Sequence, residues 1–331
     1  MDTGVFLYFI GYKNHSGIDY LLYYLSNLSF TKCNVFNEKE IIMSKKLKKI
    51  GFIGQGFIGK NYADDFESRG YNVVRYSKEP DFIQNKEEII SCDIVFIAVP
   101  TPSTPEGFDS SIVKSVLPFI GKGNTAVIKS TMLPGSTRKL AEDFPEIYVM
   151  HSPEFLREKT AAHDTKNPER NIIGIPYDTE EWQSKAQEVI ETLAPALHNK
   201  IIDIESAELI KYMSNCFLTT KVVFFNAMYD IAEKLGLDWE SIHESVVADS
   251  RIGVSHTQIM HESGHGGDAS RGAGGHCFIK DFTALRELYE RILPEETDTL
   301  NFLKSTEMNN VNLLKKSNKD LDIIQNIYGK I

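Results

Sequence analysis

The sequence predicts an α/β fold in which an amino-terminal Rossmann-type, doubly wound parallel sheet is followed by an α-helical central domain. Three observations carry this prediction. Short apolar segments alternate with helical ones between residues 49 and 150, a glycine-rich turn joins the first such pair, and a long amphipathic helix is expected over residues 206–235. Because parallel strands are joined by helical crossovers, the alternation favours a parallel sheet covered by helices.

Composition and charge exclude several classes of protein. Of the 331 residues, 42% are hydrophobic and 25% are charged, as in ordinary globular proteins. The net charge is −10 and the longest basic run is the short KKLKK at 45–49, so we expect no nucleic-acid partner. The four cysteines lack CxxC or CxxH spacing, which favours a reducing cytoplasm over a disulfide scaffold or a zinc site. The apolar stretch at 4–12 is too short to span a membrane, and we expect neither signal peptide nor anchor.

The first strand, turn and helix form a dinucleotide-binding pattern. Residues 49–59 read KIGFIGQGFIG, which predicts a strand, the turn Gly54-x-Gly56-x-x-Gly59 and then a helix over residues 60–68. Gly54 permits the tight turn, Gly56 lets a pyrophosphate approach the backbone, and Gly59 lets the helix pack on the strand. The N-terminus of the helix attracts the phosphates. A second strand over residues 71–76 completes a βαβ unit.

The end of this second strand leaves two cofactors open. The acidic residue expected there, which would bind the adenosine ribose, is replaced by Ser77, followed by Lys78. A small polar residue beside a cation suits a 2′-phosphate, whereas Ser77 can also bind a plain ribose. We expect NAD, with NADP as the alternative. Further strands are expected over residues 93–99, 125–129 and 147–150.

Cys277 follows a run of glycines and is the candidate nucleophile. The glycines leave its thiol open to a substrate, and Lys280 favours the thiolate, which is the reactive form. We expect Cys92 and Cys216, in contrast, to be buried and inert, the usual state of a free cysteine.

Polar residues four positions apart accompany the cysteine. Lys211 and Asn215 lie on the predicted long helix, where this spacing places them on one face, so they can point together at an oxygen on which negative charge develops. Asp281 stands four residues after Cys277. Glu154 and Glu158 share the spacing, although Glu154 can instead be structural, beside the turn begun by Pro153.

Several motifs occur together in the order and spacing of a known family. They are VPTP at 99–102 with DS at 109–110, STMLPGST at 130–137, SPEFLRE at 152–158 with NPERNIIG at 167–174, AELIKYMSN at 207–215 and GAGGHCFIKD at 272–281. The set resembles the UDP-glucose/GDP-mannose dehydrogenase family, in particular a short UDP-glucose 6-dehydrogenase-like form. The resemblance covers residues 48 to about 290.

The resemblance implies an NAD(P)-dependent oxidoreductase acting on CH–OH groups. A primary alcohol of a nucleotide sugar would reduce two cofactor molecules, through a thiohemiacetal and a thioester on Cys277, and end as a carboxylate. It also implies a homodimer built on the central helix. The implied catalytic residues are Thr131, Glu158, Lys211, Asn215, Cys277 and Asp281. The implied cofactor-binding residues are Gly54, Gly56, Phe57, Ile58, Gly59, Ser77, Lys78, Val99, Pro100, Thr101, Ser130 and Thr131. The implied substrate-binding residues are Glu154, Phe155, Leu156, Arg157, Glu158, Lys211, Asn215, His256, Arg271 and Gly274.

Four segments follow from these assignments. We expect an N-terminal extension outside the conserved fold (1–43), an NAD(P)-binding domain (44–203), a helical central and dimerisation domain with the cysteine (204–295) and a short helical tail (296–331). Full-length relatives carry a third domain that holds the nucleotide of the substrate. Only about 40 residues follow Glu290, and they read as one or two helices, so we expect that domain to be missing.

Two other functions and one other motif need comparison. A two-electron dehydrogenase of the 3-hydroxyacid or 6-phosphogluconate type also has Lys-x-x-x-Asn on its central helix, but it needs no cysteine nucleophile. A non-catalytic, truncated family member is disfavoured by the survival of the whole catalytic set. Residues 261–265 match the zinc motif HExxH, but Gly264, Gly266 and Gly267 disfavour the helix that the motif requires, so we expect no metal site.

Overall fold

The computed structural model describes residues 11–14, 17–20, 48–262 and 269–329, which fall into two compact units, residues 1–46 and 47–331. In the first unit, strands β1 (Gly11–Asn14) and β2 (Gly17–Tyr20) pair antiparallel. Most of the predicted extension over residues 1–43 lies outside the described residues, and its place outside the conserved fold stays a prediction.

The second unit contains a seven-stranded sheet in the order β11-β10-β9-β8-β5-β3-β4. All neighbouring strands are parallel except β9 and β10, which pair antiparallel through Gly174 and His151. The predicted α/β fold with a doubly wound sheet is therefore confirmed, with one antiparallel junction. The strands are β3 (Lys49–Ile53), β4 (Asn72–Tyr76), β5 (Ile94–Ile97), β8 (Thr125–Ile128), β9 (Tyr148–His151), β10 (Arg170–Ile175) and β11 (His198–Asp203). A separate two-stranded ribbon joins β6 (Ser103–Thr104) to β7 (Gly107–Phe108).

Helices and 3₁₀ turns cover both faces of the sheet. Phe52 and Phe96, on neighbouring strands, stack with ring centroids 5.1 Å apart and pack with Phe66 on one face. Ile53 and Ile97, the next residue of each strand, point to the other face, because side chains alternate along a strand. The covering elements are α2 (Phe57–Ser68), η1 (Ile83–Ser91), α3 (Ser111–Val116), η2 (Leu117–Phe119), α4 (Ser136–Asp143), η3 (Glu158–Thr160), α5 (Ala161–Lys166) and α6 (Glu180–Thr192).

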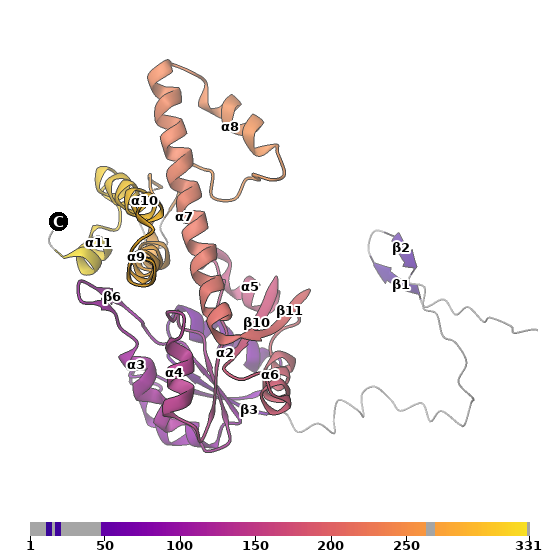
Figure 1. The fold of residues 1–331 in the computed structure, drawn as a ribbon. Helices are drawn as coiled ribbons and strands as arrows, with labels where there is room; N and C mark the ends of the chain where they lie inside the picture. Colours follow the sequence, from indigo (N-terminus) through magenta and orange to yellow (C-terminus); the bar gives the residue numbers. More distant parts are fainter. Residues whose placement is uncertain (1–10, 15–16, 21–47, 263–268, 330–331) are drawn as a thin grey trace, which may run out of the picture. The chain divides into compact units, whose positions relative to one another are not determined.

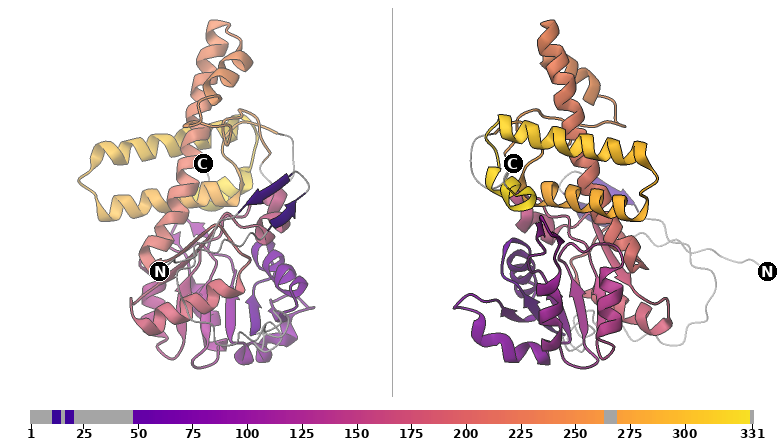
Figure 2. Two further views of the ribbon diagram at one scale, coloured as in Figure 1. Left: turned by 90° about the vertical axis from the view of Figure 1, so that its right-hand side faces the viewer. Right: turned by 60° about the vertical axis from the view of Figure 1, so that its left-hand side comes forward.

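The long helix α7 (Ile204–Leu235) leaves the sheet and carries the helical part of the unit (Figure 1). Asp203 caps its start by accepting a hydrogen bond from the Ser206 backbone, and Gly236 ends it in a left-handed conformation. Helix α8 (Trp239–Val247) folds back beside its far end. Helices α9 (Gly275–Ile292) and α10 (Thr297–Lys316) lie side by side across α7 (Figure 2), and α11 (Leu321–Tyr328) packs against α9.

The long helix begins two residues before its predicted start, and the tail, expected to form one or two helices, forms two. Strands β10 and β11 were not among the predicted elements. β11 is an edge strand whose residues are exposed or half-buried, so it has no apolar alternation to reveal it. None of the helices in the described part is long and apolar enough to cross a membrane.

Candidate active site

The glycine turn has the geometry that a dinucleotide requires. Gly54 has a φ of +93°, and a Cβ placed there would come within 2.2 Å of the Ala98 carbonyl oxygen. A Cβ at Gly59 would lie 1.9 Å from the Gly54 oxygen, so strand and helix are in direct backbone contact. A Cβ at Gly56 would meet nothing within 4 Å. The turn is thus closed on the protein side and open in front of the helix N-terminus, where a pyrophosphate fits.

Helix α2 begins at Phe57, three residues before the predicted start at Lys60. The prediction placed the whole glycine motif in the turn, and glycine does weaken helices. Packing of Gly59 against Gly54 overrides that preference. Phe57 is exposed and Ile58 is half-buried, both in the first turn of the helix that faces the open side.

The residues after β5 and β8 meet at the same carboxyl edge of the sheet. Ser130 Oγ donates to the Val99 carbonyl at 2.7 Å and accepts from the Val99 backbone N–H at 3.0 Å. Thr101 is buried, Thr131 is half-buried and Pro100 is exposed. The strand order reverses between β3 and β5, and such reversals are where open α/β sheets bind nucleotides.

The end of β4 carries Ser77 and Lys78, the two residues that left the choice between NAD and NADP open in the sequence. Ser77 is half-buried, its Oγ accepts from the Glu79 backbone at 3.2 Å, and Lys78 is exposed. Arg75, the nearest arginine in sequence, is held by ion pairs of 2.7 Å to Asp64 and Glu67.

Lys211 and Glu154 form a buried ion pair between α7 and the segment after β9. Lys211 Nζ lies 3.1 Å from Glu154 Oε1 and donates to the Glu154 carbonyl at 2.7 Å. Burial alone would lower the pKa of Lys211, but the negative charges of Glu154, Cys277 and Asp281 hold it well above its usual range. Lys211 is therefore a fixed positive charge paired with Glu154, whose role as a substrate-binding or a structural residue stays a prediction.

Asn215 and Asp281 join α7 to α9. Asn215 Nδ2 donates to Asp281 Oδ2 at 2.6 Å, and Lys280 Nζ pairs with the other carboxylate oxygen at 2.5 Å. Asp281 is fully buried. Its carboxylate is thus held from both sides, one turn of helix after Cys277.

Cys277 lies in the first turn of α9, after the N-cap Gly274. The residue is exposed, whereas Cys92 and Cys216 are buried, as predicted. Burial of the sulfur among its neighbours raises the pKa of the Cys277 thiol; Lys211 and Lys280 oppose this, and Asp281 and Glu154 reinforce it. The residue as a whole is exposed while its sulfur lies among these groups, and the members of the two ion pairs shift the pKa of the thiol in opposite directions.

The four-residue spacing of Glu154 and Glu158 does not place them together, which corrects that expectation. Residues 152–157 are not helical, and Glu158 is exposed at the start of η3, while Glu154 is buried. Arg157 is exposed and forms a 2.6 Å ion pair with Asp164. Among the described residues, no hydrogen bond or ion pair connects Glu158 or Thr131 to the buried pairs.

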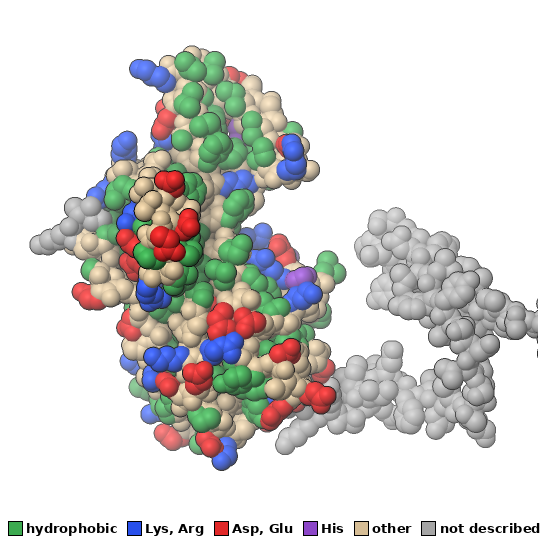
Figure 3. All heavy atoms as spheres, viewed as in Figure 1, with side chains coloured by type: hydrophobic (Ala, Val, Ile, Leu, Met, Phe, Trp, Pro, Cys, Tyr) green, Lys and Arg blue, Asp and Glu red, His purple; other side chains and the backbone are tan. Residues whose placement is uncertain are grey.

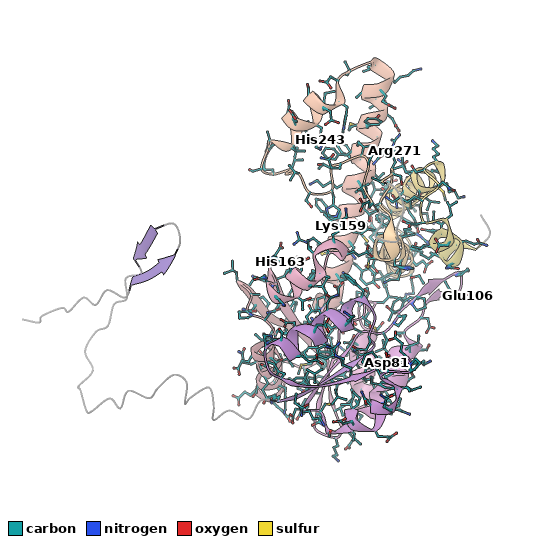
Figure 4. The ribbon with its side chains drawn as sticks, turned by 180° about the vertical axis from the view of Figure 1, so that it is seen from behind. Asp81, Glu106, Lys159, His163, His243 and Arg271 are labelled. Atoms are coloured by element: carbon teal, nitrogen blue, oxygen red, sulfur yellow. The ribbon has the colours of Figure 1, made fainter. Side chains whose placement is uncertain are left out.

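Of the other predicted substrate-binding residues, Phe155 and Leu156 adjoin the Lys211–Glu154 pair, whereas His256 and Arg271 have other partners. The backbone N–H of Leu156 donates to Glu154 at 2.8 Å, and the ring of Phe155 lies 3.7 Å from the Arg170 guanidinium. His256 has a φ of 60° and packs edge-on against Phe278. Arg271 lies against α7 (Figure 4), where it is bound at 2.7 Å by Asn226 and at 2.6 Å by Asp230.

Lys129 is a buried cation that the sequence did not lead us to expect. Lys129, the last residue before Ser130, is buried, donates to Ser152 at 2.9 Å and has a pKa lowered to about 8 by burial. A lysine directly after an apolar strand was the available signal. The second histidine of the HExxH motif, His265, lies outside the described residues, and the remainder of the described chain holds no cluster of three or more potential metal ligands.

Matches to family models and similarity to individual proteins both indicate the same family. Residues 81–194 match the NAD binding domain, and residues 205–311 the central domain, of the UDP-glucose/GDP-mannose dehydrogenase family. The chain is 36% identical over 214 residues to UDP-glucose 6-dehydrogenase TuaD of Bacillus subtilis, covering 60% of this chain and 43% of the relative. It is 29% identical over 274 residues to UDP-glucose 6-dehydrogenase of Rickettsia prowazekii, covering 78% of this chain and 60% of the relative.

The chain thus spans about half the length of the curated relatives it matches. A UDP-glucose dehydrogenase structure from Pyrobaculum islandicum aligns with 80% of this chain and 69% of its own, with a TM-score of 0.66 and 26% identity. The match to an NAD binding domain agrees with the open glycine turn and confirms the expectation of NAD. By its motifs, its fold and both domain matches, the chain belongs to the UDP-glucose/GDP-mannose dehydrogenase family.

Proposed function

We propose that the protein oxidises the primary alcohol of a nucleotide sugar to a carboxylate, as a UDP-glucose 6-dehydrogenase-like enzyme. The observation that carries the proposal is an exposed cysteine in the first turn of α9, next to a buried lysine and a buried carboxylate that set its charge. The relatives named above are UDP-glucose 6-dehydrogenases, which supports a nucleotide sugar as substrate.

The chain's own residues supply the groups that this oxidation needs. Lys211, held as a cation, stabilises the negative charge that develops on the substrate oxygen, and Asn215 keeps the neighbouring Asp281 in place. The Cys277 thiolate adds to the aldehyde carbon, which gives a thiohemiacetal whose oxygen can expel a second hydride. Water then cleaves the resulting thioester and returns the thiol. NAD, when bound at the glycine turn, accepts the hydrides.

The atoms balance over the whole sequence. One primary alcohol and one water become one carboxylate, with the release of two hydrides and three protons, and Cys277 ends as it began. A two-electron dehydrogenase would need only the first of these steps and no thiol. A non-catalytic family member would need none, although it could keep the fold.

We infer a homodimer from the surface of α7. Exposed apolar side chains recur along this helix at spacings of three, four and seven residues, which places them on one face. Figure 3 shows hydrophobic side chains gathered over α7 and α8. An apolar stripe of this length on a soluble protein usually marks an interface. Its members are Leu209, Met213, Phe217, Phe224, Met228, Ile231 and Leu235.

We also infer a reducing, cytoplasmic setting. Cys92, Cys216 and Cys277 are all free thiols, and a reactive thiol such as that of Cys277 needs to stay reduced.

A stoichiometric assay tests the proposed reaction. Purified protein is incubated with UDP-glucose, GDP-mannose or UDP-N-acetylmannosamine and with NAD or NADP, while reduced cofactor and acid product are followed. The proposal expects two reduced cofactors per substrate. One per substrate would favour the two-electron alternative, and no turnover with any nucleotide sugar would favour the non-catalytic one.

Two cysteine variants make this assay specific. Cys277→Ser should lose acid formation while it still binds NAD. Cys92→Ala, which truncates a buried thiol at the end of η1, is the matched control and should keep the parental stoichiometry. Acid formation by Cys277→Ser at the parental rate would rule out the thioester.

A further inference from the structure

Side chains in and next to the turn between α10 and α11 form hydrogen bonds with the backbone that precedes Cys277. We call this set of hydrogen bonds, made by Asn310, Lys319 and Asp320, the grip. The segment that precedes Cys277, residues 269–276, is called the cysteine loop below. Lys319 is buried, and its Nζ donates to the carbonyl oxygens of His261 at 2.8 Å, Gly272 at 3.0 Å and Ser270 at 3.2 Å. An ammonium has three protons to donate, so the three carbonyls use all of them.

Two further side chains from the same region hold the next residues of the loop. Asn310, also buried, accepts from the Ala273 backbone N–H at 2.7 Å and donates to the Ala273 carbonyl at 2.9 Å. Asp320 Oδ2 accepts from the Gly275 backbone N–H at 2.8 Å. Gly275 is the first residue of α9, so Asp320 binds the helix start in whose first turn Cys277 lies.

The backbone of the turn that carries Lys319 has an unusual conformation. Asn318 and Asp320, on either side of Lys319, both have positive φ, at 53° and 51°. Residues other than glycine adopt this conformation at a cost, and they keep it where the surrounding contacts require it. On the loop side, Gly272 has a φ of +93°, and a Cβ there would lie 2.9 Å from Leu314 on α10. The turn that carries Lys319 and the cysteine loop therefore both have backbone conformations that fit their mutual contacts.

We propose that Asn310, Lys319 and Asp320 are positioning residues for Cys277: they fix the cysteine loop and the start of α9, and through them the place of the thiol. The inference rests on the proposed function, in which Cys277 attacks an aldehyde. The match to the family's central domain ends at residue 311, so Lys319 and Asp320 lie beyond it. A nucleophile displaced by about 1 Å can lose as much as a hundredfold in rate, which makes such a grip effective.

The test removes the grip and measures the thiol directly. In Lys319→Met, the cysteine loop should loosen and the Cys277 thiol should become more solvated. Alkylation by iodoacetamide, followed at the Cys277 peptide by mass spectrometry, should then quicken by about threefold or more, with a lower pH midpoint. With nucleotide sugar and NAD, kcat should fall on the order of tenfold, with little change in KM. Lys316→Met, at the exposed end of α10, is the matched control and should behave like the parent in both assays.

A second pair of variants decides the matter if Lys319→Met does not fold. Asp320→Gly suits the positive φ and removes the side chain with its carboxylate, whereas Asp320→Asn suits it and can still accept from Gly275. The glycine variant should speed alkylation and lower kcat, and the asparagine variant should restore the parental kcat. If Asp320→Gly melts earlier but keeps parental alkylation and kcat, the grip is only structural and the inference is wrong.

The alkylation measurement uses no substrate. If the parental protein oxidises no nucleotide sugar, the proposed function fails, while a change in the alkylation of Cys277 in Asp320→Gly still shows that the grip controls the thiol. Unchanged alkylation in an active protein overturns the grip and leaves the proposed function standing.

Discussion

Asn215 on α7 donates a 2.6 Å hydrogen bond to Asp281 on α9, and both side chains are buried. The second oxygen of Asp281 is paired with Lys280, so the carboxylate is held from both sides, one helical turn from Cys277. Asp281 raises the pKa of the Cys277 thiol and Lys280 lowers it, so the direction in which a substitution near the thiol shifts this pKa can be predicted.

Replacing Asp281 should make Cys277 a stronger acid. Asp281 raises the pKa of the thiol, so Asp281→Asn removes a negative charge and should lower the pH midpoint of iodoacetamide alkylation. The amide can still meet Asn215, which limits structural damage. Asp298→Asn, at an exposed position in α10, is the control and should leave the midpoint unchanged. A midpoint that rises in Asp281→Asn would contradict the assigned sign.

Replacing Lys211 should have the opposite effect. Its ammonium lowers the pKa of the Cys277 thiol, so Lys211→Met should move the alkylation midpoint upward. The variant also leaves Glu154 as a buried charge without its cation, which should cost about 3–5 kcal/mol of unfolding free energy. Both quantities are measured against Lys234→Met, an exposed lysine near the end of the same helix. Equal midpoints in the two variants would remove Lys211 from the electrostatics of the thiol.

Local patterns predicted the parts of this site that lie within one element. The glycine turn, the helix carrying Lys211 and Asn215, and the loop before Cys277 each have a sequence signature. The ion pair of Lys211 with Glu154 joins residues 57 apart, and no spacing rule brings them together. The grip of Lys319 on the cysteine loop spans 47 to 49 residues and ends in backbone carbonyls, which no sequence pattern identifies.

The three glycines of the cofactor turn should respond differently to alanine. At Gly54 and Gly59 a Cβ collides with backbone, so these variants should lose more than about 2 kcal/mol of stability. At Gly56 the space is open and the backbone is extended, so Gly56→Ala should melt near the parental temperature. If a pyrophosphate lies there, the added methyl should weaken NAD binding by about tenfold or more, measured by calorimetry. Parental NAD affinity in Gly56→Ala would place the cofactor elsewhere.

Glu208 should make stability depend on pH below neutrality. It is fully buried and caps the start of α4, accepting from Gly135 and Thr137, and burial raises its pKa to about 7. An unfolded glutamate titrates near 4.3, so between about pH 4.3 and 7 the folded protein binds the extra proton. Its contribution to stability is therefore greatest below that window and decreases as the pH rises through it, by on the order of 3–4 kcal/mol.

Denaturation at several pH values checks this sign. The difference in unfolding free energy between the parent and Glu208→Gln should shrink steadily from pH 5 to 7.5, because glutamine cannot ionise. Glu240→Gln, an exposed substitution on α8, should give a constant difference. A constant difference for Glu208→Gln as well would mean that the carboxyl ionises at the same pH in both states.

The apolar stripe on α7 predicts that one charge in its middle separates the proposed homodimer. Phe217 is 65% exposed, so Phe217→Glu should leave the fold of the monomer intact while it places a carboxylate in the centre of the interface. Light scattering after size exclusion should give the parent twice the 37.4 kDa chain mass and the variant a single chain mass. Phe302→Glu makes the same change at a residue of α10 that is 54% exposed and lies off the stripe, and it should keep the parental mass. If Phe217→Glu also keeps a doubled mass, the copies meet through another face, and the stripe on α7 needs a different partner.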